Sequence, residues 1–274
     1  MTGTGTQEDQ YIVDNWIDFV QATAIKDAYV KFADGGGTIN MNEICPDGMT
    51  ETVTIRAFVD GNGWNIKNIH LNGGYAFNIC NKVENLNFTD FNIESSNSSR
   101  RAIMFSFDYF TPTGTSENRY GLLYKCAFNG YLTGGYPNMF KGANNDTDRI
   151  SLMRCSAKLK ITENSHLNQS YRVLCNHCVF DIDAPNSIDP FYDMPLNNCL
   201  IFGSYKSLTI PGYSKYVIVD AECQSQAASQ GGKSELIIGN QDKAALSNNF
   251  NAVTTEQLKN PAYLASLGYP IGVD

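Results

Sequence analysis

The chain has 274 residues, of which 42% are hydrophobic and 18% charged, so it is long enough for one domain with a substantial core. Its formal net charge of −8 and its pI of about 4.9 argue against nucleic acid as a partner. No apolar run reaches the ~18 residues of a membrane span, and the first residues lack the pattern of a signal peptide, so we expect neither membrane insertion nor signal-dependent export.

The N-terminal region is predicted to be an extended arm followed by a short helix. Residues 1–10 are polar and rich in Gly and Thr, which favours the arm. Trp16 and Phe19 then lie three residues apart, on one face of a helix, and Asn15 before them is a good N-cap residue. We therefore expect a helix at about 15–24. Placed over the end of a stack of strands, it would cover exposed apolar side chains and unpaired strand groups.

A short unit recurs along the chain: an apolar residue, two polar residues, Cys or an aliphatic residue, a spacer and a further residue that is usually apolar. Its six copies are Ile66–Leu71, Val83–Phe88, Leu123–Phe128, Leu152–Ala157, Cys175–Phe180 and Leu196–Ile201. Measured at the fourth residue, successive copies lie 17, 40, 29, 23 and 21 residues apart. Periods of roughly 20–30 residues, each with a short strand, are typical of a stacked fold.

The repeat predicts an all-β fold over residues 11–274, a single-stranded right-handed parallel β-helix with short capping helices at both ends. The 40-residue step fits either two coils of such a solenoid or one coil with a large loop. Asn is abundant between the predicted strands, where it tolerates left-handed backbone and can stack in ladders.

The cysteines are interpreted as core residues. Four of the eight occupy the fourth position of the unit, namely Cys126, Cys155, Cys178 and Cys199. Because Cys175 takes the apolar first position, we expect it to be buried as well and all five to be reduced. The alternative is that Cys175, His177 and Cys178 form half of a zinc site or a redox dithiol, but no second ligand pair lies nearby. We therefore expect no metal and no cofactor.

Residues 109–148 are predicted to be an inserted loop rich in Tyr, Gly and Thr. Five of its aromatic residues are candidates for binding: Tyr109, Phe110, Tyr120, Tyr131 and Tyr136. Aromatic rings among small polar residues can stack on sugars or dock a protein. The alternative is that they pack the loop against the side of the solenoid.

Asp181 and Asp183 flank Ile182, and the two-residue period of a strand places both carboxylates on the outer face. A solvated or weakly cation-binding face is the expected role. The alternative is a glycosidase pair or calcium ligands, with Asp189 and Asp193 nearby. The chain has no Asp-Asp pair, Gly-His-Gly or Arg-x-Lys, which a polygalacturonase-type site requires. We therefore assign no catalytic residue.

The C-terminal region is predicted to end in a second cap at about 254–270. Thr254 or Thr255 can serve as the N-cap of a helix that starts at Glu256, in the manner of a capping box. Gly268 would end the helix.

Both ends of the chain resemble a known group of proteins. Gly3–Val13, followed by the Asn/Trp/Phe helix, and the segment Thr255–Ile271 are similar to the ends of right-handed parallel β-helix proteins of gut Bacteroidales and their crAss-like phages. Gln10 stands where that group usually has Pro. The resemblance implies the fold, and the missing secretion signal favours the phage branch over the secreted, adhesin-like branch.

We therefore hypothesise a non-enzymatic structural or attachment protein of a phage particle, such as a head-fibre or tail component, made in the bacterial cytoplasm and located in the virion. The expected partners are two further copies in a homotrimer, other virion proteins and surface glycans. Two alternatives stay open, a polysaccharide-degrading β-helix enzyme and a secreted glycan-binding adhesin.

Overall fold

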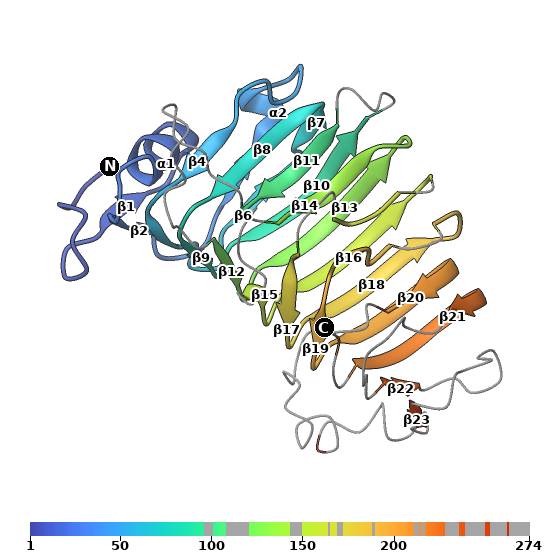
Figure 1. The fold of residues 1–274 in the computed structure, drawn as a ribbon. Coiled ribbons are helices and arrows are strands. Elements are labelled where there is room, and N and C mark those ends of the chain that lie inside the picture. Colours follow the sequence, from blue (N-terminus) through green and yellow to red (C-terminus); the bar gives the residue numbers. More distant parts are fainter. Residues whose placement is uncertain are drawn as a thin grey trace.

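The structure, a computed structural model, is mostly β and is built from parallel sheets (Figure 1). The strands lie stacked in chain order, from the helix α1 (Trp16–Thr23) at one end toward β23 (Phe250–Ala252) at the other. The residues that the structure describes are 1–95, 101–107, 121–142, 150–163, 165–168, 172–187, 190–210, 214, 217–227, 236–238, 250–252 and 262.

The described strands form three sheets, in which all neighbouring strands run parallel. Sheet A contains β1 (Tyr11–Val13), β2 (Tyr29–Phe32), β5 (Phe58–Asp60), β9 (Lys82–Glu84), β12 (Leu122–Tyr124), β15 (Ile150–Met153), β17 (Leu174–Asn176) and β19 (Leu196–Asn197). Sheet B contains β3 (Thr38–Asn40), β6 (Asn65–Lys67), β7 (His70–Asn72), β10 (Asn87–Glu94), β13 (Ala127–Thr133), β16 (Ser156–Ile161), β18 (Val179–Ala184), β20 (Leu200–Thr209), β21 (Val217–Ala227), β22 (Leu236–Ile238) and β23. Sheet C contains β4 (Val53–Ile55), β8 (Gly74–Ile79), β11 (Ala102–Ser106) and β14 (Pro137–Lys141).

The chain visits the sheets in the order C, A, B and then begins again. One such circuit is β8, β9 and β10, the next is β11, β12 and β13, and the third is β14, β15 and β16. Because β10 pairs directly with β13, and β9 with β12, the 40-residue step from Leu86 to Cys126 is one circuit with a long connection.

The recurring unit marks the corner at which the chain leaves sheet A and enters sheet B. Its first residue is a buried residue of a sheet A strand, and its fourth is buried just before sheet B begins. The copy at Ile66–Leu71 was placed wrongly, because Ile66 pairs with Phe88, the sixth residue of the next copy. In that circuit the buried corner residue is Trp64, so the first step is 22 residues rather than 17. The corner there holds extra glycines, which hid the match.

Each third residue of the six copies has a positive φ, between 50° and 59°. These residues are Asn68, Asn85, Lys125, Arg154, His177 and Asn198. A single left-handed residue turns the chain sharply, and Asn tolerates this conformation better than Lys or Arg. Amides also link successive circuits, as in the bond from Asn198 Nδ2 to Asn176 Oδ1 at 3.4 Å.

The core between the sheets is rich in aromatic rings. Phe77, Phe105 and Phe140 come from neighbouring strands of sheet C, with ring centroids 5.7 and 6.1 Å apart and planes inclined by 22°. Phe88 and Phe128 stack in the same way in sheet B, at 5.9 Å. All five side chains are buried, so the rings of one circuit pack on those of the next and fix the register of the strands.

The five unit cysteines are all buried, as predicted, and none of them forms a disulfide. The core position that holds Trp64 and Leu86 in the early circuits is filled by cysteine in the later ones. A thiol there acts as a small apolar group.

The helix α1 begins after Asn15, whose side chain accepts a hydrogen bond from the Asp18 amide at 3.0 Å. It packs against β1, β2 and β4, and Phe19 stacks on Phe32 with centroids 5.3 Å apart. A second helix, α2, spans Met41–Ile44. Within the described ranges, the helices are too short to span a bilayer. The C-terminal cap predicted at about 254–270 lies outside the described residues, apart from Ala262.

The insertion predicted over 109–148 is too long and needs correction. Strands β12, β13 and β14 lie inside this range and belong to the three sheets. The Gly, Thr and Tyr content suggested a loop, but the alternation of buried and exposed residues in β13 is that of a strand with one face in the core. The remaining parts of the range, 109–120 and 143–148, lie outside the described residues.

Candidate functional site

The aromatic residues that the sequence proposed for binding do not form one described patch. Tyr109, Phe110 and Tyr120 lie outside the described residues. Tyr131 points outward from β13 with an exposed fraction of 51%, and Tyr136 lies just before β14 with 43%. They stand on either side of a Gly-Gly turn between sheets B and C.

Asp181 and Asp183 point outward from β18, as the sequence predicted, while Phe180 and Ile182 are buried. The parallel register sets Asp181 beside Lys158 and Asp183 beside Lys160. Each carboxylate therefore has a cationic neighbour on the same solvated face, so the two strands present alternating positive and negative side chains to solvent.

One further contact fixes the orientation of Asp183. Ser204 on β20 donates a hydrogen bond from Oγ to its Oδ1 at 2.5 Å. Tyr131 lies on the same outward face of sheet B, because it pairs with Lys160 and Lys160 pairs with Asp183. The structure therefore brings Tyr131 and the two aspartates onto one face.

The other two acidic residues do not extend this face. Asp193 lies in the turn before β19, with its Oδ1 3.8 Å from Arg172 Nε, and Asp189 lies outside the described residues. Within the described part of the chain, no group of three or more His, Cys, Asp or Glu residues could hold a metal ion. Burial raises the pKa of the Cys155, Cys175 and Cys199 thiols, which favours the protonated form rather than a thiolate ligand. Burial also opposes a thiolate at Cys178, but hydrogen bonds from these three thiols lower the pKa of Cys178.

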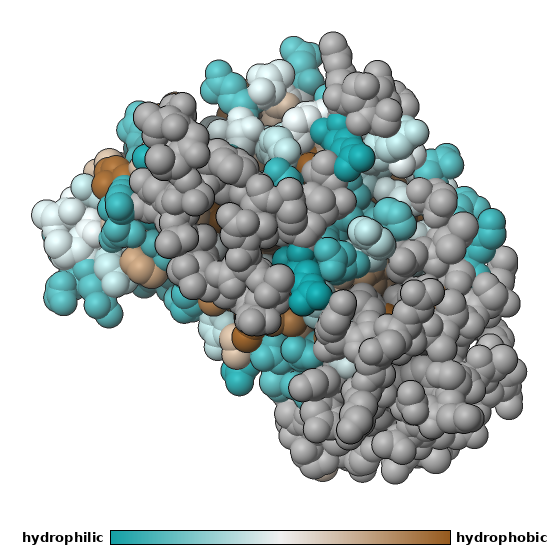
Figure 2. Space-filling model, viewed as in Figure 1, coloured by the Kyte–Doolittle hydropathy of each residue, from teal (hydrophilic) through white to brown (hydrophobic). Residues whose placement is uncertain are grey.

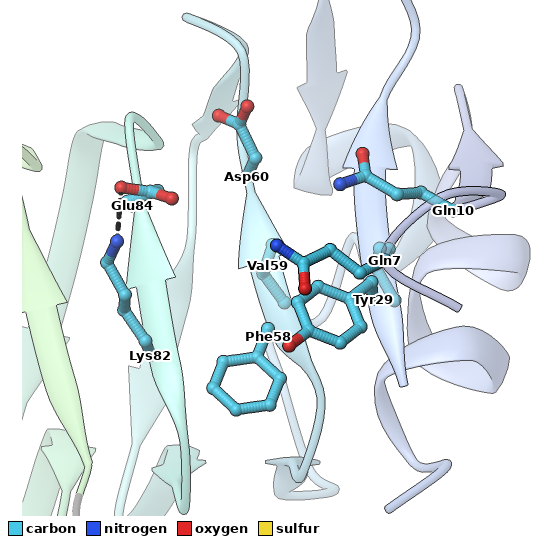
Figure 3. Close-up of a pocket in the computed structure, with 9 residues that line it drawn as sticks. Gln7, Gln10, Tyr29, Phe58, Val59, Asp60, Lys82 and Glu84 are labelled. Atoms are coloured by element: carbon cyan, nitrogen blue, oxygen red, sulfur yellow. Dashed lines mark ion pairs between the residues drawn. The ribbon is translucent and has the colours of Figure 1, made fainter. Parts of the chain in front are cut away.

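A pocket that the sequence did not predict lies on the outer face of sheet A near the N-terminal end (Figure 3). Its volume is about 260 Å³. The residues that line it come from the N-terminal arm and from β2, β5 and β9: Gln7, Gln10, Tyr29, Val30, Phe58, Val59, Asp60, Lys82 and Glu84.

The floor of the pocket is aromatic. Tyr29 and Phe58 occupy paired positions of β2 and β5, so their side chains point the same way from adjacent strands. Their ring centroids are 4.8 Å apart and their planes are inclined by only 18°. Both rings are partly exposed, and Figure 3 shows them next to each other among the lining residues.

Charged groups form one side of the pocket. Lys82 Nζ lies 2.6 Å from Glu84 Oε2 and 4.9 Å from the centroid of the Tyr124 ring. Asp60 Oδ1 accepts hydrogen bonds from the Asn62 amide at 2.9 Å and from Asn85 Nδ2 at 3.1 Å. These contacts hold both carboxylates in place at the edge of the aromatic floor.

The N-terminal arm forms the opposite side and is itself tied to the sheet. Thr2 pairs with Ile12 in an antiparallel bridge, and the Tyr29 amide donates to the Gly5 carbonyl at 2.9 Å. Gly5 has a φ of 78°, and a Cβ there would lie 2.3 Å from the Tyr11 ring, so the arm needs glycine at this point. The arm thus carries Gln7 and Gln10 to the pocket.

The pocket was missed because its residues are far apart in sequence and look like ordinary strand residues. The alternation of Tyr29–Phe32 is that of a strand, but nothing in the sequence pairs Tyr29 with Phe58 or brings residues 1–10 over sheet A. On the face drawn in Figure 2, the coloured surface is mainly hydrophilic and its brown areas are small, so no large apolar patch marks a binding face in that view.

Comparisons with known proteins bear on the fold. No protein-family model matches the chain, and no curated protein matches it. A crystal structure from Bacteroides ovatus, described as that of a "putative immunoglobulin A1 protease", is similar with a TM-score of 0.51 and 14% sequence identity. The similarity covers 96% of this chain and 89% of that one. At this identity it concerns the fold alone, which the chain shares with a protein of the Bacteroidales.

Proposed function

We propose that the three sheets wind as a right-handed parallel β-helix and that the protein is a non-enzymatic structural or attachment component of a phage particle, assembled as a homotrimer. The regular C, A, B circuits and the corner residues support the β-helix. The resemblance of Gly3–Val13 to β-helix proteins of Bacteroidales and their phages supports the proposal that the protein is part of a virion.

One observation carries the non-enzymatic part of the proposal. The residues with reactive chemistry in the recurring unit, the cysteines, are enclosed in the core, while the paired outward carboxylates on β18 have cationic neighbours. A rigid stack with a solvated outer face suits attachment through surfaces and pockets rather than turnover in a buried site.

The test is to purify the phage particle that carries this gene and to search its proteins by mass spectrometry. We expect the chain in the particle at a fixed ratio to the capsid protein. The purified chain should sediment at about 91 kDa, three times the 30.3 kDa of one chain. A monomer that is absent from the particle would contradict the proposal.

The alternative of a polysaccharide-degrading enzyme is favoured by one feature, the common outward face of Asp181 and Asp183. Two carboxyl groups on one side of a strand can form an acid and base pair. The discriminating assay measures the release of reducing ends from host capsular polysaccharide. We expect none; release that is lost in Asp181→Asn and Asp183→Asn would favour the enzyme.

A further inference from the structure

We infer that the pocket between the N-terminal arm and sheet A binds an uncharged pyranose ring at a terminus or branch of a surface glycan. The inference rests on the proposed attachment function, since it names the class of ligand to which the protein would attach. Pockets for larger organic ligands usually have volumes of ~300–1,000 Å³. At about 260 Å³, this one suits one sugar unit rather than a long chain.

The floor suits the apolar face of a sugar. A pyranose ring presents axial C–H groups on one side, and these pack against aromatic rings. The register of β2 and β5 stacks the Tyr29 and Phe58 rings on one another with nearly parallel planes, so a sugar can pack against the ring faces and edges that are turned away from the partner ring. Because strands rather than a loop hold the rings, little conformational freedom has to be lost on binding.

The rim suits the hydroxyl groups of a sugar, each of which both donates and accepts hydrogen bonds. Asp60 uses Oδ1 for its bonds to Asn62 and Asn85, and among the described residues no partner is seen for Oδ2. The side-chain amides of Gln7 and Gln10 likewise have no hydrogen-bond partner among the described residues. The rim therefore combines fixed acceptors with groups that can donate.

The charges select against acidic sugars. Asp60 and Glu84 bring two negative charges and Lys82 one positive charge, which is already paired with Glu84 at 2.6 Å. Lys31 lies beside Asp60 in the register of β2 and β5, but its Nζ is paired with Asp34 Oδ1 at 2.7 Å. The chain as a whole carries −8. A uronic or sialic acid would therefore be repelled, while a neutral hexose or an N-acetylhexosamine would not.

The test uses the full chain and saturation-transfer NMR with methyl glycosides of glucose, galactose, mannose and N-acetylglucosamine, and with methyl glucuronide as the acidic comparison. We expect at least one neutral glycoside to bind with millimolar affinity, with the strongest transfer to its axial C–H protons. Phe58→Leu, which keeps an apolar side chain but removes the ring, should weaken binding by about tenfold. Phe58→Tyr should retain it.

The matched control is Tyr192→Ala, because this tyrosine is 51% exposed and lies in the turn between β18 and β19, outside the pocket. It should leave binding unchanged. The inference is overturned if no neutral glycoside binds the wild-type chain, if methyl glucuronide binds as well as the neutral glycosides, or if Tyr192→Ala and Phe58→Leu weaken binding equally. Failure here is separable from failure of the proposed function, because the presence of the chain in the particle is measured independently by mass spectrometry.

Discussion

At the corner between sheets A and B, single residues adopt a backbone conformation that their side chains do not favour. Asn85 and Asn198 adopt positive φ at modest cost, but Lys125, Arg154 and His177 occupy the same position in the circuits between them. Left-handed backbone costs an ordinary residue about 1 kcal/mol or more. The corner is retained because it places the next residue in the core, where each circuit packs on its neighbours.

This geometry predicts that Arg154→Gly stabilises the protein. Glycine adopts the observed φ of 55° without steric strain, so we expect the free energy of unfolding to rise by about 0.5 to 1 kcal/mol, measured by urea denaturation. The control is Lys158→Gly on the outer face of β16, which should destabilise by a similar amount because a strand disfavours glycine. Destabilisation by both substitutions would contradict the role assigned to the corner.

The cysteine position of the core predicts a difference between two small substitutions. Cys178 has an exposed fraction of 0%, and its thiol donates a hydrogen bond to the Asn176 carbonyl at 3.4 Å. Because a C–O bond is shorter than a C–S bond, a hydroxyl placed there by Cys178→Ser would lie farther from this acceptor while remaining buried. We expect Cys178→Ser to lower the free energy of unfolding by about 1 to 3 kcal/mol. Cys178→Ala, which only leaves a small cavity, should cost less. If urea denaturation showed equal losses of stability for Cys178→Ser and Cys178→Ala, the result would argue that water reaches this position of the core.

At the scale of elements, the N-terminal helix is the part that sequence reasoning placed best. The N-cap preference of Asn15 and the helical spacing of Trp16 and Phe19 are local signals, and α1 begins at Trp16. Its packing against β1, β2 and β4 covers the first circuit. The formation of α1 therefore depends on its packing over the first circuit, since an isolated helix of this length is only marginally stable.

The cap gives a direct prediction for this element. Asn15→Ala removes the bond from the Asp18 amide and should lower the free energy of unfolding by about 1 kcal/mol. Ile17→Ala on the same helix is the control, because Ile17 is 67% exposed and should change stability by less than about 0.5 kcal/mol. Both values follow from chemical denaturation, and a larger loss in Ile17→Ala would mean that a contact of Ile17 matters more than the cap.

The strands show where sequence reasoning reached its limit. The recurring unit identified the sheet A corners correctly from Val83 onward, because burial at fixed spacing is a local signal. It failed at Ile66, where the extra residues in the preceding corner shift the pattern by one strand. The pocket could not be predicted for a different reason. The pairing of Tyr29 with Phe58 depends on the register of β2 and β5, and no short sequence motif specifies that register.

At the scale of the whole molecule, each circuit contacts mainly the one before and the one after. Stability in such a fold is approximately a sum of circuit and interface contributions. Columns of like residues therefore act together, as the aromatic core does in the early circuits and the cysteines do in the later ones. When several circuits share the same kind of residue, the small effects of these residues should add up to a measurable change in the free energy of unfolding of the whole chain.

The buried thiols provide such a property, because stability should fall as the solution becomes alkaline. Burial raises the pKa of Cys155, Cys175 and Cys199 in the folded chain, whereas a thiol in the unfolded chain has a pKa of about 8.5. Above that pH the unfolded chain releases protons that the folded chain retains, so the folded state is progressively disfavoured. The contribution of these thiols is complete below about pH 8.5 and is lost as the pH rises toward the folded values.

We therefore expect these three thiols to make the free energy of unfolding fall above about pH 8.5, by up to about 1.4 kcal/mol per pH unit for each thiol. Cys178 acts in the opposite sense below that pH: although burial opposes it, hydrogen bonds from the Cys155, Cys175 and Cys199 thiols lower the pKa of Cys178, which favours the folded chain as the pH rises toward 8.5. Cys155→Ala removes one of the three groups and should make the fall less steep. Cys45→Ala, which removes a half-buried thiol outside the column, is the matched control and should leave the slope unchanged. Urea denaturation at a series of pH values, with a reductant present, measures the slopes. If Cys155→Ala left the slope of the free energy of unfolding against pH unaltered, other groups would cause the loss of stability at alkaline pH. The buried unit cysteines would then contribute through packing alone.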